Sequence, residues 1–147
     1  MNAQHSAYIF SEGKITLPAQ YQDRSVNQLL PVKPGPAISI NRDLLATGKD
    51  LATYITEQLN TLAPKVPGFT QHARSPVQLG ANLYAGEFIH ISFVRETQRI
   101  SQMQAIFHTE EGRVLIFSMS KMGEFAQSEQ KQFSDMVASF TCHEERA

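Results

Sequence analysis

The five histidines are the residues best suited to acid–base chemistry or metal binding near neutral pH. They stand at His5, His72, His90, His108 and His143. None has the i, i+4 spacing of a zinc-binding HExxH helix, and none belongs to a His/Cys cluster. His90 and His108 can share one face of a sheet, but two imidazoles without a carboxylate make a poor metal site. We therefore interpret the histidines as surface or cross-strand residues.

Signals for nucleophilic catalysis or phosphate binding are equally weak. Cys142 precedes His143, but adjacent side chains rarely face each other, so a Cys–His pair is not indicated. Ser118 and Ser120 have no nucleophile-elbow setting around them, and the glycines are isolated rather than gathered in a phosphate-binding loop. We expect no catalytic residue, no metal and no cofactor. The sequence favours a binding module over an enzyme.

Composition points to one globular domain over residues 1–147. Hydrophobic residues make up 41% and charged residues 18%, an ordinary balance for a chain that can bury a core. The net charge is −1, and no basic cluster suggests a nucleic-acid partner. The single cysteine excludes an internal disulfide. With no signal-peptide pattern and no apolar run of about 20 residues, we expect a cytoplasmic protein without stable membrane association.

Hydrophobic periodicity predicts two helices and a mainly antiparallel sheet. Leu51–Leu62 has apolar residues at helical spacing, with Asp50 as its N-cap and Pro64 at its end. Apolar residues from Phe133 to Phe140 follow the same period. Strands are predicted over Ala7–Phe10, Lys14–Leu17, Arg24–Leu30, Pro36–Arg42, Phe69–Leu79, Leu83–Arg95, Ile100–His108 and Arg113–Ser120. The expected fold class is α+β: a curved antiparallel sheet with both helices packed on one face and an open concave face for binding.

The residues on each face are predicted from the parity of their numbers. If each hairpin pairs residues whose numbers add to an even total, the odd-numbered ones share the helix-covered face. These are Phe93, Met103, Ala105, Phe107, Leu115, Phe117 and Met119. The opposite face then holds His90, Ser92, Ile100, Gln102, Gln104, Ile106, His108, Ile116 and Ser118. This second face is semi-apolar and almost uncharged, which favours a surface covered by a partner, although a third layer or a dimer mate would give the same pattern.

An ordered set of short motifs over nearly the whole chain resembles the Eag chaperones of type VI secretion, a cytoplasmic branch of the DcrB-like group with a PsbP-like fold. The motifs are Ile9-Phe10-Ser11-Glu12-Gly13, Leu17-Pro18, Tyr21-Gln22-Asp23-Arg24-Ser25-Val26-Asn27, Ile40-Asn41-Arg42-Asp43, Tyr54 with Gln58-Leu59, Pro67-Gly68-Phe69, and Met103-Gln104-Ala105-Ile106-Phe107. The resemblance implies a non-enzymatic homodimer. It also implies a chaperone that shields the N-terminal transmembrane helices of a PAAR or Rhs effector before export.

The resemblance further implies a client-binding surface on the concave sheet face and part of the first helix. Carried over by position, it comprises Val26, Gln28, Ala37, Ser39, Asn41, Gln58, Leu62, Val66, Ile100, Gln104, Ile106 and Ile116. The sequence departs from the family at Gln28, Asn41 and Pro64. Two other classes stay open: a small-molecule or lipid-binding module of the PsbP/DcrB type, and a small hydrolase that uses His90 or His108.

Overall fold

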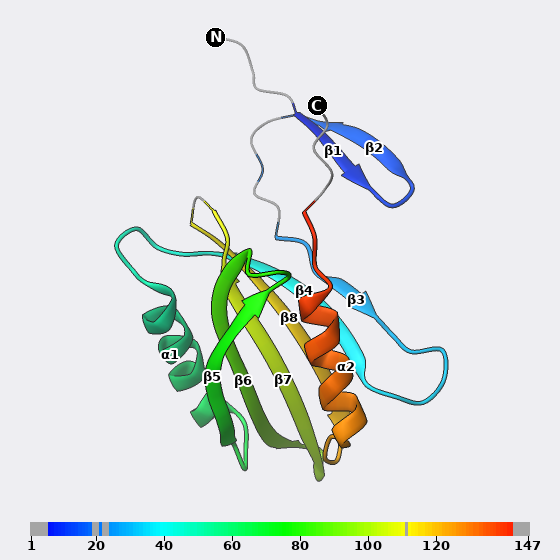
Figure 1. Ribbon diagram of the computed structural model, residues 1–147, viewed down its shortest axis with the longest axis vertical. Coiled ribbons are helices and arrows are strands. Elements are labelled where there is room, and N and C mark those ends of the chain that lie inside the picture. The colour runs from blue at the N-terminus through cyan, green and yellow to red at the C-terminus, as the bar shows by residue number, and fades with distance from the viewer. Residues whose placement is uncertain (1–5, 19–20, 22–23, 111, 143–147) are drawn as a thin grey trace.

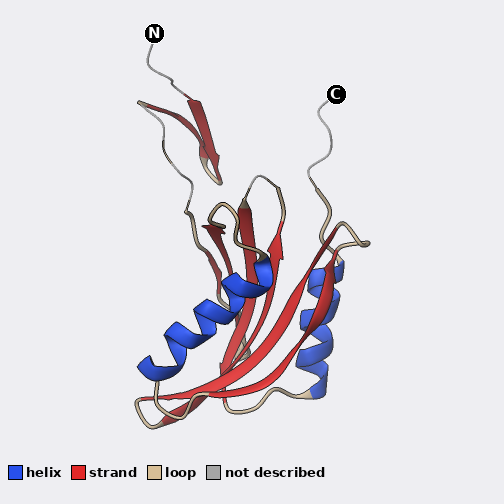
Figure 2. Ribbon diagram, turned by 90° about the vertical axis from the view of Figure 1, so that its left-hand side faces the viewer, coloured by secondary structure: helices blue, strands red, loops and turns tan. Residues whose placement is uncertain are grey.

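The computed structural model describes residues 6–18, 21, 24–110 and 112–142 (Figure 1). A six-stranded antiparallel sheet forms the body, with strand order β3-β4-β8-β7-β6-β5. Its strands are β3 (Asn27–Leu29), β4 (Ala37–Leu44), β5 (Thr70–Leu79), β6 (Tyr84–Arg95), β7 (Gln98–His108) and β8 (Arg113–Met122). A separate hairpin of β1 (Ser6–Phe10) and β2 (Gly13–Leu17) precedes it. The α+β class and the curved antiparallel sheet are confirmed (Figure 2).

The first helix begins and ends where the sequence predicts. Helix α1 (Leu51–Leu62) starts after Asp50, whose carboxylate accepts a 2.8 Å hydrogen bond from the Thr53 backbone N–H. The 3₁₀ turn η1 (Ala63–Lys65) contains Pro64 and closes the helix. In the described part of the chain, no helix combines the length and apolar character needed to span a bilayer.

The two helices cover opposite faces of the sheet, which corrects the expectation that both pack on one face (Figure 2). Helix α2 (Gln127–Ala138) places Phe133 and Val137 in one apolar cluster. Helix α1 places Tyr54 and Ile55 in the other. We call these sides the α2 face and the α1 face. Each helix has its own apolar stripe, and a sheet with apolar residues on both faces can bury both stripes.

The division of residues between the faces follows from the hairpin turns. The turn between β6 and β7 has two residues, Glu96 and Thr97, both with positive φ. It therefore pairs Arg95 with Gln98 and, further along the ladder, Phe93 with Ile100. These pairs add to an odd total, so the parity rule fails for β6.

Three residues consequently lie on the face opposite to the predicted one. Phe93 belongs to the α1 face, in the cluster beneath that helix. His90 and Ser92 belong to the α2 face, because they pair with Met103 and Ser101. The β7–β8 ladder does pair residues with even totals, such as Met103 with Met119. The predicted faces of β7 and β8 are therefore confirmed.

Candidate binding surface

A shallow trough crosses the part of the α1 face that the helix leaves uncovered. It consists of two adjoining hollows of about 600 and 300 Å³ that share Phe93, Arg95 and Gln102. The larger hollow lies beside the end of α1 and η1 and reaches Leu62 and Val66. The smaller hollow extends over β8 and β4 to β3. Together they form a continuous depression from the first helix to the edge strand.

Seven of the twelve residues assigned to client binding line this trough. They are Leu62, Val66 and Gln104 in the larger hollow and Gln28, Ala37, Ser39 and Ile100 in the smaller one. In the β4–β8 ladder, Ser39 lies opposite Ser118. In the β3–β4 ladder, Gln28 lies opposite Ser39. The fold thus brings residues from four separate parts of the chain to one surface.

The other five assigned residues lie beside or beneath the trough. Ile106 is only 4% exposed and packs in the cluster under α1, so a partner cannot reach it in this conformation. Ile116 is half-buried against the same cluster, next to its pairing partner Asn41. Gln58 is exposed on α1, one helical turn before Leu62, and Val26 is 59% exposed just before β3.

Amides and hydroxyls form the floor of the trough. Ser39 and Ser118 share a 2.6 Å hydrogen bond across the β4–β8 ladder. On β7, Gln104 donates through Nε2 to Gln102 Oε1 at 2.6 Å. Gln102 in turn donates through Nε2 to Ser120 Oγ at 3.0 Å. These hydrogen bonds hold the polar side chains in place; Ser118 is buried beneath the floor, whereas Ser39, Gln102, Gln104 and Ser120 are half-buried and line the trough.

One polar atom on this face lacks a partner. The Asn41 Oδ1 atom is buried and accepts no hydrogen bond from the residues that the structure describes. A buried acceptor without a donor costs about 1–3 kcal/mol, so such atoms usually have a structural or functional reason. Its neighbour across the ladder is Ile116, which has no donor in its side chain. A partner with a hydroxyl or amide donor would satisfy it.

Charged residues also line the trough, and they were not predicted from the sequence. The Arg95 guanidinium, where the two hollows join, lies over the Phe93 ring, 5.7 Å from its centroid. Lys65 and Glu96 line the larger hollow. Parity had placed Phe93 on the other face, which hid this aromatic wall. The two-residue turn at Glu96-Thr97 was the signal that would have corrected it.

Tyr54 fastens α1 over the adjoining part of the same face. Its hydroxyl donates a 2.6 Å hydrogen bond to Asp43 on β4. Burial of the ring, followed by this bond to a carboxylate, raises the pKa of the Tyr54 hydroxyl. The tyrosine therefore stays protonated and keeps its donor role across the physiological range. Because α1 is anchored in this way, the position of Leu62 at the trough is fixed.

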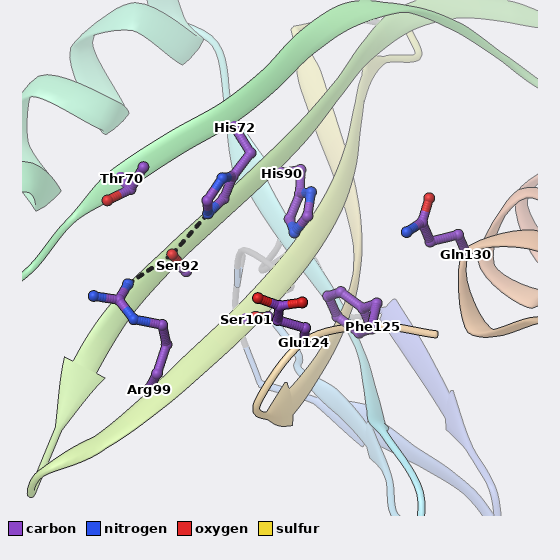
Figure 3. Close-up of a pocket in the computed structure, with 9 residues that line it drawn as sticks. All are labelled: Thr70, His72, His90, Ser92, Arg99, Ser101, Glu124, Phe125 and Gln130. Atoms are coloured by element: carbon purple, nitrogen blue, oxygen red, sulfur yellow. Dashed lines mark hydrogen bonds between the residues drawn. The ribbon is translucent and has the colours of Figure 1, made fainter. Parts of the chain in front are cut away.

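The histidines do not gather into a metal site. Among the described residues, no group of three or more His, Cys, Asp or Glu side chains could hold a metal ion. His108 is exposed at the end of β7, and Cys142 is an exposed free thiol. His90 lies instead beside His72 in a hollow on the α2 face (Figure 3). His5 and His143 lie outside the described residues.

Comparison with known proteins gives a family and a fold. The model of the DcrB family matches residues 12–139 of this chain. The crystal structure of PA94 from Pseudomonas aeruginosa, a protein of unknown function described as a candidate regulator, superposes with a TM-score of 0.77. Sequence identity is 19%, and the match covers 97% of this chain and 100% of PA94. That level of identity supports a shared fold.

A second solved structure is more distant. LpqN of Mycobacterium tuberculosis, involved in cell envelope biogenesis, matches at 14% identity with a TM-score of 0.45. The match covers 80% of this chain and 79% of LpqN. No curated protein sequence matches this chain.

Proposed function

This chain belongs to the DcrB family, and we propose that it acts there as a non-enzymatic cytoplasmic chaperone for a secreted effector. Its client is the N-terminal transmembrane-helix region of a PAAR or Rhs effector of type VI secretion. The observation that carries the proposal is the trough on the α1 face, with apolar walls at Leu62, Val66 and Ile100 around a floor of amides and hydroxyls. The motif resemblance to the Eag chaperones supports the same client class.

The chemistry of the trough suits an apolar helix. A transmembrane helix of about 20 residues is roughly 30 Å long and aggregates in water unless its surface is covered. Aliphatic walls cover such a surface at about 25 cal/mol per Å² of apolar area removed from water. Transmembrane helices also carry Ser, Thr and small residues at their interfaces, which donate and accept hydrogen bonds across helices.

The polar floor provides partners for those groups. The Gln102 and Gln104 amides can each donate and accept. Ser39 and Ser120 add hydroxyls in the smaller hollow. Lys65, Arg95 and Glu96 line the trough beside this floor, but an apolar helix offers them no opposite charge, so a bound helix leaves without breaking a strong ion pair. That property fits a chaperone that must release its client at export.

A homodimer is part of the proposal. The two hollows total less than the volume of one transmembrane helix, so a single trough covers one side of a client helix only. A second copy of the chain would supply a second trough for the same client region. Light scattering of the purified chain at micromolar concentration should give twice the 16.4 kDa monomer mass. A monomer at every concentration would remove this part of the proposal.

The chaperone function is tested by co-expression with a client fragment that contains the effector's transmembrane helices. We expect the fragment to be soluble only when this chain is present. Gln104→Lys places a charge on the trough floor and should abolish co-purification, while Gln132→Lys, the same change on the exposed side of α2, should leave it intact. Equal soluble yield with and without the chain, or full capture by Gln104→Lys, would contradict the proposal.

A further inference from the structure

A second cavity lies on the α2 face, on the other side of the sheet from the trough. It has a volume of about 480 Å³ and lies between β5, β6, β7 and the segment that leads into α2 (Figure 3). Its polar lining includes Thr70, Ser101 and Gln130. It is also lined by one arginine, one glutamate and two histidines. The proposed chaperone function does not use these ionisable side chains.

Arg99 is exposed at one side of this cavity, and one of its nitrogens is held by two hydrogen bonds. Its Nη1 atom donates to Ser92 Oγ at 2.8 Å and to the Gly68 carbonyl at 3.3 Å. The Ser92 hydroxyl is also 2.8 Å from His72 Nε2, and Ser92 is 1% exposed. No carboxylate of the described residues pairs with Arg99. The guanidinium is thus fixed through one nitrogen, and its Nε and Nη2 donors are left for a ligand.

Glu124 supplies the opposite charge to the same cavity. The loop that carries it is tied to β7, because the Gly123 N–H donates to the Arg99 carbonyl at 2.9 Å. Gly123 has φ of 81°, a conformation that suits glycine and sets the direction of the loop. Glu124 nevertheless forms no ion pair with Arg99 or with any other residue that the structure describes. Two opposite charges therefore line one cavity without neutralising each other.

A row of three rings, His72, His90 and Phe125, lines one wall of this cavity. The β5 strand has a bulge between Gln71 and Ala73, and His72 lies at this extra position. Bulges redirect a side chain, and here the His72 ring reaches the hollow and lies 4.7 Å from the His90 ring. The His90 ring lies 5.7 Å from that of Phe125 in an edge-on arrangement. The rings are tilted against one another, by 40° between His72 and His90 and by 60° between His90 and Phe125, and the Phe125 ring gives this wall an apolar part that suits contact with a hydrocarbon side chain.

We propose that this cavity binds a small zwitterion, of which a free α-amino acid is the simplest example. Arg99 receives the carboxylate, Glu124 receives the ammonium group, and the side chain packs on His90 and Phe125. A simple anion would meet the Glu124 carboxylate, and a simple cation would meet Arg99. Arg99 and Glu124 are both exposed, so water solvates them in the free protein, and a neutral ligand would gain no ion pair with either. Only a ligand with both charges satisfies both residues.

The histidines support this charge pattern. Burial, with a smaller contribution from the neighbouring His72, lowers the pKa of His90. The His90 ring is therefore neutral at pH 7 and does not repel a bound ammonium group. This site is independent of the client trough, so either proposal can fail while the other stands.

The test is calorimetric titration of the full-length chain with L-leucine and L-phenylalanine at pH 7. We expect saturable binding at millimolar concentration or tighter. N-acetyl-L-leucine lacks the ammonium group and L-leucinamide lacks the carboxylate. Each should bind about tenfold more weakly or worse, because it loses the hydrogen bonds to one of the two charged residues. Absence of binding by both amino acids, or equal binding of either modified compound, would overturn the proposal.

Single substitutions test the roles of Glu124 and Arg99 separately. Glu124→Gln makes no change to any described contact and should weaken leucine binding about tenfold, whereas Glu12→Gln in the β1–β2 turn should not change it. Arg99→Gln should abolish leucine binding. Because Arg99 also donates a hydrogen bond to Ser92, the melting temperature of this variant is measured as well, to show that it is still folded. Leucine affinity unchanged by Glu124→Gln would show that Glu124 does not hold the ammonium group, and the proposal would fall.

Discussion

The two faces of the sheet are built differently, and strand β7 shows the contrast within a few residues. Toward α2, its residues Met103, Ala105 and Phe107 are at most 1% exposed and belong to an aromatic-rich core. Toward α1, Gln102 and Gln104 are half-buried amides in the trough. Alternate residues of this part of the strand are therefore buried in a core on one side and half-buried in an open trough on the other.

Helix α1 covers only part of the α1 face. Ile89, Ile91 and Ile106 are buried beneath that helix, but the floor towards β3 has serines and amides instead. Removing apolar surface from water stabilises the fold, whereas half-buried amides add little. The fold thus concentrates its stability in the α2 cluster and under α1, and the remaining surface is free to vary with a partner.

The largest effect is expected where the α1 face is closed. Ile106→Asp places an unpaired charge in the cluster beneath α1, where Ile106 is 4% exposed. We expect a loss above about 4 kcal/mol, enough to abolish cooperative thermal unfolding. Gln104→Asp, two residues away on the same face, should melt near the wild-type temperature. Normal melting of Ile106→Asp would mean that α1 leaves the sheet readily in solution.

On the α2 face, Phe133→Ala should be the next most damaging change. Phe133 is 1% exposed and packs near Phe88, with ring centroids 6.0 Å apart. Truncation leaves a cavity and should reduce the free energy of unfolding by about 3–5 kcal/mol, measured by urea denaturation with an unchanged m-value. Gln132→Ala, its exposed neighbour, serves as the control. A loss below about 1 kcal/mol would indicate that α2 contributes little to this core.

The elements of this fold could be predicted from sequence because each has a local signal. The apolar period and Asp50 defined α1, and alternation defined the long strands. Which residues of a strand lie on which face, however, depends on the length of the turn. The two-residue turn at Glu96-Thr97 places the residues of β6 on the faces opposite to the predicted ones. The opposite placement of the helices is a tertiary property that no local pattern encodes.

The candidate surface could be predicted only in part for the same reason. Ile100 and Gln104 were correctly predicted to lie on the α1 face, because the faces of β7 and β8 were predicted correctly. Ser39 on β4 was assigned through the family resemblance, and it also lines the trough. Ile106 has the right parity, but whether α1 covers it depends on how far the helix extends over the sheet. The hollow around His72 and His90 depends on a bulge, and a single extra residue in a strand leaves no clear trace in the sequence.

The α2 face should also respond to pH through His90, a half-buried residue that lines its cavity. Its pKa is lowered in the folded state by burial, from a usual value of 6.5. The folded protein therefore binds fewer protons than the unfolded chain, and stability falls as pH drops through about 6.5. His90→Gln should reduce the fall in urea midpoint between about pH 7 and 5, whereas His108→Gln, on an exposed strand end, should not. An identical pH profile for wild type and His90→Gln would contradict burial of a neutral ring.

The smallest effect on stability is expected on the open part of the α1 face. A substitution there should affect client binding more than the free energy of unfolding, which distinguishes this surface from the α2 core. Gln104→Ala removes the donor to Gln102 Oε1, but the freed oxygen faces the trough and can be hydrated. The free energy of unfolding should change by no more than about 0.5 kcal/mol. In the complex that oxygen would be covered by the client helix, so the same change should weaken client binding by about 1–3 kcal/mol. Urea denaturation of the free chain and titration with the client fragment measure the two quantities on one variant. A large stability loss would place Gln104 in the core, and unchanged client affinity would remove the floor of the trough from recognition.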